Sequence, residues 1–176
     1  LDAGDPPVYV GFGSMSGSNP EVTFHLICDA LRLAGRRGVI SVGWSRAKLN
    51  QQDHVYVLSS APHDWLFPRM SAIVHHGGAG TTGASCRSGK PTMVIPHFTD
   101  QPYWGRRVYE LGVGVKPIPR HRLTVEKLAH GITQLTTDPE IIERAALLGE
   151  AIRAEDGIAR AVELIEHYAN VGVRRI

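Results

Sequence analysis

Residues 75–82 read HHGGAGTT and lie between a short apolar strand, Ala72–His75, and a helix expected over Thr82–Ser88. A glycine-rich turn of this kind brings free backbone N–H groups and the positive end of a helix dipole to the end of a strand. Glycine has no side chain, so a phosphate group can approach such a backbone closely. The pattern predicts an anion site suited to a diphosphate, although the same glycines would also serve a tight turn without a ligand.

The two histidines that start this turn are expected to differ in direction. Successive side chains of a strand point to opposite faces, which should send His75 into the packing against the sheet. His76 would then lie beside the free amides, where an imidazole can donate a hydrogen bond to a phosphate oxygen.

Outward from this turn, apolar strands alternate with helical segments. Asn19 and Pro20 supply an N-cap and a first-turn proline for a helix that Gly35 should end. Such alternation is typical of a mainly parallel sheet, so the sequence predicts a Rossmann-like, doubly wound α/β fold with ligands at the carboxyl ends of the strands. The strands are expected at Val8–Phe12, Gly38–Val42, Val55–Leu58, Ala72–His75, Thr92–Ile95 and Gly114–Val115.

The C-terminal part changes to helices alone. Thr124 and Asp138 are expected to cap two of them, and a last helix should follow Asp156 and Gly157. Residues 1–7 contain two prolines and no initiator Met, which indicates an inter-domain linker with a further domain upstream. Residues 8–176 are then expected to form one domain.

Composition narrows the function classes. The 19 Lys and Arg residues are scattered and nearly balanced by 17 Asp and Glu, which disfavours a nucleic-acid surface. No apolar run approaches the roughly 18 residues that cross a bilayer, and no signal peptide is recognisable. Cys28 and Cys86 lack metal or redox spacing and are expected to be buried in a reducing, cytoplasmic compartment. No metal-ligand cluster and no GxSxG nucleophile motif is present.

The first loop offers a second group of small residues at a strand end. Gly11 and Gly13 superficially suggest a dinucleotide fold that binds NAD, but the third glycine is misplaced and no acidic residue ends the second strand. Arg46 would suit NADP, yet hydride transfer is the weaker interpretation. The hydroxyl of Ser14 could instead reach the same phosphate as the turn at residues 75–82.

Asp100 and Gln101 follow the strand expected at Thr92–Ile95. A carboxylate beside a carboxamide offers acceptors and donors for neighbouring sugar hydroxyls. Equally, Asp100 could simply cap a helix expected over Gln101–Leu111. Trp44 and Trp65 are candidates to stack on a nucleotide base, although tryptophans in such positions more often serve packing.

Residues 75–101 read HHGGAGTTGASCRSGKPTMVIPHFTDQ, and this run resembles the donor-binding signature of family 1 GT-B UDP-glycosyltransferases. With GFGS at residues 11–14 and Glu155–Ile158, the similarity covers almost the whole chain. It is greatest to the sterol 3-beta-glucosyltransferases and extends to the glycopeptide- and macrolide-type antibiotic glucosyltransferases.

The resemblance implies a role for each candidate residue. Asp100 and Gln101 would bind hexose hydroxyls, and Thr99 departs from the glycine that many sterol-type relatives carry. At Ser60, plant members carry a stacking Trp. The diphosphate would contact Ser14, His76, Gly78, Gly80 and Thr81, and the uridine would contact Trp44, Ser60, Ala61 and His63.

The same resemblance implies an inverting transfer of a hexose, most simply glucose, from a UDP-sugar to a hydroxyl of a sterol, lipid or natural-product aglycone. The UDP-sugar is a co-substrate, and no cofactor or metal is expected. The catalytic base and most of the acceptor pocket would belong to an absent N-terminal domain, so the fragment alone should be inactive. A lipid acceptor would bring the full-length protein into peripheral contact with a membrane.

Two other functions remain open at the level of sequence. One is a non-catalytic nucleotide-sugar-binding module or subunit that needs a separate acceptor-binding chain. The other is a UDP-sugar epimerase, which would require paired carboxylates near the sugar, whereas only Asp100 is available.

Overall fold

The computed structural model describes residues 1, 4–12, 19–41 and 52–173. Its five strands are all parallel and form one sheet in the order β3-β2-β1-β4-β5. The order reverses between β1 and β4, which is the switch point where α/β folds open a crevice for ligands. The strands are β1 (Val8–Gly11), β2 (Gly38–Ser41), β3 (Val55–Leu58), β4 (Ala72–His75) and β5 (Thr92–Val94).

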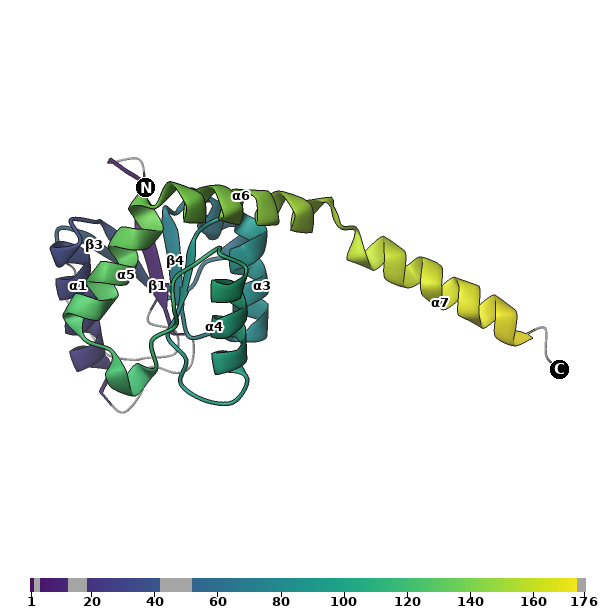
Figure 1. Ribbon diagram of the computed structural model, residues 1–176, viewed down its shortest axis with the longest axis horizontal. Helices are drawn as coiled ribbons and strands as arrows, with labels where there is room; N and C mark the ends of the chain where they lie inside the picture. The colour runs from purple at the N-terminus through teal and green to yellow at the C-terminus, as the bar shows by residue number, and fades with distance from the viewer. Residues whose placement is uncertain (2–3, 13–18, 42–51, 174–176) are drawn as a thin grey trace.

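Helices cover both faces of this sheet (Figure 1). They are α1 (Pro20–Leu33), α2 (His63–Leu66), α3 (Ala79–Ser88), α4 (Gln101–Glu110), α5 (Val125–Thr137), α6 (Pro139–Ala154) and α7 (Gly157–Val173), with 3-10 turns η1 (Phe67–Arg69) and η2 (Arg120–Arg122). The helices α1 and α5 pack on one face, and α2, α3, α4 and α6 pack on the other. The predicted doubly wound α/β fold is confirmed.

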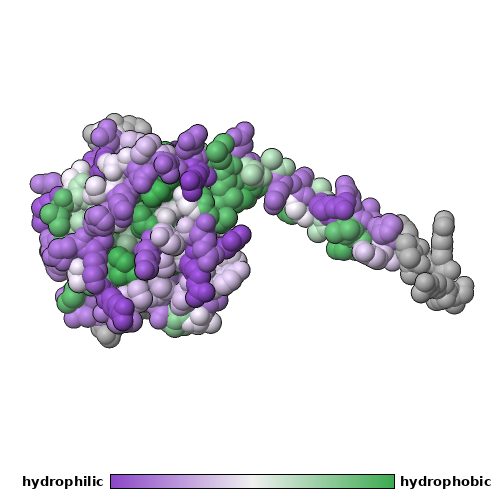
Figure 2. All heavy atoms as spheres, viewed as in Figure 1, coloured by the Kyte–Doolittle hydropathy of each residue, from purple (hydrophilic) through white to green (hydrophobic). Residues whose placement is uncertain are grey.

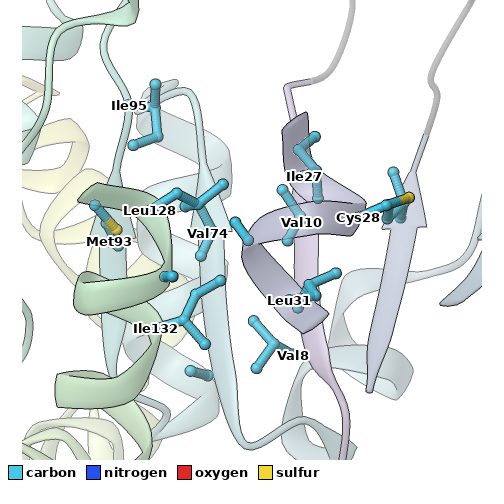
Figure 3. Close-up of a cluster of buried hydrophobic side chains, with 14 of the residues drawn as sticks. Val8, Val10, Ile27, Cys28, Leu31, Val74, Met93, Ile95, Leu128 and Ile132 are labelled. Atoms are coloured by element: carbon cyan, nitrogen blue, oxygen red, sulfur yellow. The ribbon is translucent and has the colours of Figure 1, made fainter. Parts of the chain in front are cut away.

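The main core lies between the sheet and the pair α1 and α5 (Figure 3). Val10 and Val74 come from the two central strands, and Leu31 and Ile132 come from the two helices that cover them. All four are fully buried. Cys28 is buried in the same cluster as a free thiol, as expected, whereas Cys86 is free and only partly buried.

The predicted helix starts are largely confirmed. The Asn19 carboxamide oxygen accepts from the Val22 N–H at 3.2 Å, Thr124 accepts from Lys127, and Asp138 accepts from Glu140 and Ile141. Each bond satisfies an N–H that the helix itself leaves free. Gly35 follows α1 in a left-handed conformation with φ of 61°, as expected for a helix stop.

One predicted strand and one predicted helix start are wrong. Residues 114–115 form no strand, because Gly114 makes only an isolated parallel bridge to Thr92 and the chain then enters a segment with Pro117 and Pro119, which lack the N–H needed for a ladder. The helix expected from Thr82 begins at Ala79 instead. The low helix propensity of glycine favours a later start, but the packing of α3 against other elements outweighs it. Smaller differences of one residue affect the ends of β1, β5 and α4.

The last helix projects away from the rest of the domain (Figures 1 and 2). It carries the expected apolar side chains, but Ile158 is 82% exposed and Ile165 and Tyr168 are each 69% exposed. None of the helices in the described ranges has both the length and the apolar character required to cross a membrane.

Candidate functional site

The glycine-rich turn lies at the centre of the carboxyl edge of the sheet. It leaves β4 at His75, which pairs with Gly11 at the end of β1. Because β1 and β4 flank the reversal in strand order, the turn lies at the switch point. The predicted diphosphate turn is therefore placed where folds of this class bind their ligands.

The first turn of α3 has no side-chain cap, in contrast to α1, α5 and α6. Gly78 occupies the N-cap position with φ of −61° and ψ of 139° and offers no side chain to the helix. The first N–H to bond within the helix is that of Thr82, which donates to the Gly78 carbonyl at 2.8 Å. The amides of residues 79–81 therefore have no intrahelical partner, and they lie at the positive end of the helix dipole.

Gly77 brings the second candidate segment against this turn. Its φ is 94°, and a Cβ built on it would lie 2.6 Å from Val94 Cγ1 and 3.1 Å from the Gln101 carbonyl oxygen. The start of α4 thus rests on the backbone of Gly77, at a distance that only glycine allows. The candidate diphosphate turn and the candidate sugar-binding pair are consequently neighbours.

His75 points inward, as the alternation predicted. Its side chain is fully buried, and Nδ1 accepts from the Gly77 N–H at 2.9 Å. Burial lowers the pKa of His75 to about 3, and His76 and His63 add smaller effects in the same direction. The imidazole is therefore neutral with its proton on Nε2, which has no hydrogen-bond partner. His75 shapes the turn rather than meeting a ligand.

His76 lies half-buried over the start of α3. A Cβ on Gly78 would come within 2.6 Å of His76 Nε2, so the ring covers the N-cap position. Burial lowers the pKa of His76, as does His97, whereas the Asp100 carboxylate and the Gly11 carbonyl oppose these effects. A neutral imidazole next to free amides can donate one hydrogen bond to an anion without adding a full charge.

Asp100 stands at the N-cap position of α4 but does not cap it, so the interpretation as a helix cap is wrong. Its side chain makes no capping hydrogen bond; Oδ2 instead accepts from Trp104 Nε1 at 2.8 Å. The preceding residue, Thr99, has φ of 59°, a left-handed conformation that is rare for a β-branched side chain. Strained backbone of this kind is frequent at binding sites.

Gln101 is buried, and its amide oxygen accepts from the backbone N–H groups of His97 at 2.7 Å and Phe98 at 3.2 Å. The residue therefore holds the loop at residues 97–100 closed. The sequence predicts only a sugar-binding role for Gln101 and gives no indication of these hydrogen bonds within the loop. The hydrogen bond from Trp104 to Asp100 is likewise not predicted. The four-residue spacing from Asp100 to Trp104 on a helix is the signal that could have found the latter.

The candidate uridine segment follows β3. Ser60 is exposed and Ala61 partly buried, and both line a cavity of about 640 Å³. The His63 ring stacks on Phe67 with a centroid distance of 4.2 Å, so one of its faces serves packing. The Trp65 ring is covered by the Arg69 guanidinium at 4.6 Å.

Several sequence-predicted residues lie outside the described residues, namely Ser14 and Trp44 of the site and Gly13 and Arg46 of the NAD(P) alternative. Of the candidates that the structure describes, His76, Gly78, Gly80 and Thr81 lie in the turn after β4 and at the start of α3. Asp100 and Gln101 lie at the start of α4, which packs against Gly77 of the same turn. Ser60, Ala61 and His63 follow β3, at the outer end of the carboxyl edge of the sheet. Among the described His, Cys, Asp and Glu residues, no group of three could hold a metal ion.

Comparison with known proteins adds to this geometry. A family model described as "Erythromycin biosynthesis protein CIII-like, C-terminal domain" matches residues 46–166. The sterol 3-beta-glucosyltransferase UGT80A2 of Arabidopsis thaliana is 45% identical over 165 residues, which are 93% of this chain and 26% of the relative. The sterol 3-beta-glucosyltransferase of Pichia angusta is 41% identical over 169 residues, covering 92% of this chain and 13% of the relative. The chain thus spans about a quarter or less of these relatives.

Solved structures show the same fold. The glycotransferase of kitacinnamycin superimposes with a TM-score of 0.79 at 26% identity, covering 95% of this chain and 44% of that one. CalG4, the calicheamicin glycosyltransferase, gives a TM-score of 0.80 at 24% identity, with 94% of this chain and 42% of that one covered.

Proposed function

Because the chain belongs to the family of C-terminal domains like that of erythromycin biosynthesis protein CIII, we propose that it binds the nucleotide-sugar donor of a glycosyltransferase. It is a glycosyltransferase C-terminal domain related to the sterol glucosyltransferases. The donor in this proposal is a UDP-hexose, with UDP-glucose preferred because the curated relatives named above are glucosyltransferases. Residues 1–7 serve as a linker, and residues 8–176 form the donor-binding domain.

The observation that carries this proposal is the uncapped first turn of α3 packed beside the Asp100 loop. The free amides of residues 79–81 and the half-buried imidazole of His76 suit a diphosphate. The exposed carboxylate of Asp100 suits hydroxyl groups of the attached hexose. Gly77 holds these two segments together, so one ligand with a diphosphate and a sugar can meet both.

The same geometry suits the departure of the nucleotide. When an acceptor hydroxyl attacks the anomeric carbon, the bond to the diphosphate breaks and negative charge grows on the leaving oxygen. Amides fixed by a helix start need no reorganisation to stabilise that charge, which is how a preorganised site lowers a barrier. No metal is required for this role.

The remaining parts of the reaction lie beyond this chain in the proposal. A catalytic base and a pocket for a lipophilic acceptor such as a sterol, lipid or natural-product aglycone come from an N-terminal domain, and the chain alone transfers no sugar. The full-length enzyme acts in the cytoplasm, with peripheral membrane contact where the acceptor is a lipid.

Replacing His76 by alanine tests the diphosphate site. We expect isothermal titration to detect UDP binding by the parent chain without added Mg²⁺. The His76→Ala variant should bind about 1.5–3 kcal/mol more weakly, because a hydrogen bond to a charged group is lost. His130→Ala, an exposed position on α5, is the matched control and should bind like the parent. Absence of UDP binding at millimolar nucleotide would rule out the proposed function.

Replacing Asp100 by alanine tests the hexose site. The variant should lose affinity for UDP-glucose but keep its affinity for UDP, because the carboxylate contacts the sugar and not the diphosphate. Titration of both ligands against both proteins gives the comparison. Equal losses for UDP and UDP-glucose would show that Asp100 supports the loop without binding the hexose.

A further inference from the structure

Trp104 makes the only hydrogen bond that the Asp100 carboxylate receives within the described residues. Its indole Nε1–H donates to Oδ2 at 2.8 Å across one turn of α4. No Lys, Arg or His of the described chain forms an ion pair with Asp100. An exposed carboxylate is free to rotate about its side-chain bonds unless a contact holds it, and among the described residues the indole N–H supplies the hydrogen bond that restricts this rotation.

Trp104 is itself held by its surroundings. Its ring is partly buried and meets the Tyr103 ring edge to face, with centroids 5.2 Å apart. It also lines a cavity of about 220 Å³ together with Ala79 and Thr82 of α3 and Leu148 of α6. An indole has only two side-chain torsions, so this packing fixes the direction in which its N–H points.

We infer that Trp104 is a positioning residue that orients the Asp100 carboxylate toward the hexose and so contributes to the choice of sugar. The inference rests on the proposed function. With Oδ2 engaged by the indole, Oδ1 is the oxygen left for a sugar hydroxyl, and its lone pairs point in a fixed direction. A fixed acceptor favours a hydroxyl on one side of the hexose ring over its epimer, whereas a rotating carboxylate serves both.

The test is a double-mutant cycle with Trp104→Phe and Asp100→Ala, read by titration of UDP, UDP-glucose and UDP-galactose. Phenylalanine keeps an aromatic ring at this position but is smaller than tryptophan and has no N–H to donate to Asp100. Trp104→Phe should weaken UDP-glucose about five- to tenfold, leave UDP within twofold, and reduce the ratio between the two epimeric sugars. In the Asp100→Ala background the same change should have no further effect on UDP-glucose.

Tyr103→Phe is the matched control, since it changes the exposed aromatic neighbour and leaves the indole in place. Thermal melting of every variant separates loss of fold from loss of binding. A Trp104→Phe effect that is equal for UDP and UDP-glucose, or that persists without Asp100, would show a purely structural role and overturn the inference. If Asp100→Ala weakens UDP-glucose selectively and Trp104→Phe does not, only the inference fails. If Asp100→Ala does not weaken UDP-glucose more than UDP, both the proposed hexose site and the inference about Trp104 fail.

Discussion

Gly77→Ala is expected to destabilise the domain by roughly 2–5 kcal/mol, since it combines backbone strain with overpacking. The residue has φ of 94°, and an added methyl group would meet Val94 Cγ1 at 2.6 Å and the Gln101 carbonyl at 3.1 Å. Val94 is fully buried in β5 and cannot move aside without disturbing the sheet. Urea unfolding monitored by circular dichroism measures the loss.

Gly83→Ala is the matched control for this prediction. Gly83 lies in the interior of α3 on its exposed side, and a Cβ there would meet no atom within 4 Å. The change should stabilise the domain by about 0.5–1 kcal/mol, because alanine favours the helix more than glycine does. A Gly77→Ala variant as stable as the parent would mean that the turn does not require the left-handed conformation.

Acidification is expected to destabilise the domain through His75. The folded-state pKa is lowered to about 3, whereas a histidine in an unfolded chain titrates near 6.5. Between these values the unfolded chain binds a proton that the folded chain excludes, so the stability is complete above about pH 6.5 and falls as the pH drops. From pH 7 to pH 5 the loss from His75 alone is about 2 kcal/mol.

The variant His75→Asn isolates this contribution. Asparagine can still accept a hydrogen bond from the Gly77 N–H but does not titrate. Unfolding of the variant in acid should therefore take up about one proton fewer, which makes the plot of unfolding free energy against pH less steep. His63 and His76 also have lowered pKa values and should maintain the remaining slope. Urea unfolding at several pH values between 5 and 8 provides the measurement. An unchanged slope in the variant would show that His75 is not the group responsible.

The fold was largely predictable because hydrophobic patterning and helix capping are local signals. Caps such as Asn19 and Asp138 need only a few neighbouring residues to act, and both were identified from sequence and confirmed. The segment at Gly114 was wrong because a strand requires a continuing ladder, which the later prolines interrupt. The start of α3 was placed too late, since the contacts that offset its glycines come from distant elements.

The candidate site was predictable to the extent that its residues act through backbone geometry. The glycines of residues 77–80 predict a turn that leads from a strand into a helix with free backbone amides, and the structure has such a turn with an uncapped start of α3. That this turn binds an anion stays a prediction. The internal bonds of Gln101 and the contact between Asp100 and Trp104 depend on loop and rotamer conformations that local sequence does not determine. The roles of Ser60, Ala61 and His63 toward uridine stay predictions.

The parallel sheet also has a consequence for the rate of folding. Its central pair joins β1 to β4, two segments that are separated along the chain by all of α1, β2, β3 and α2. A hairpin cannot form this pair, because the two strands are parallel and far apart in the sequence. The entropy cost of closing the long loop between them has to be met before their contacts can form. The switch point at which the ligand site is proposed therefore forms only when distant parts of the chain have met, and refolding should be slow. Partly folded chains expose apolar surface and unpaired strand edges during this time, so aggregation should reduce the refolding yield at high protein concentration.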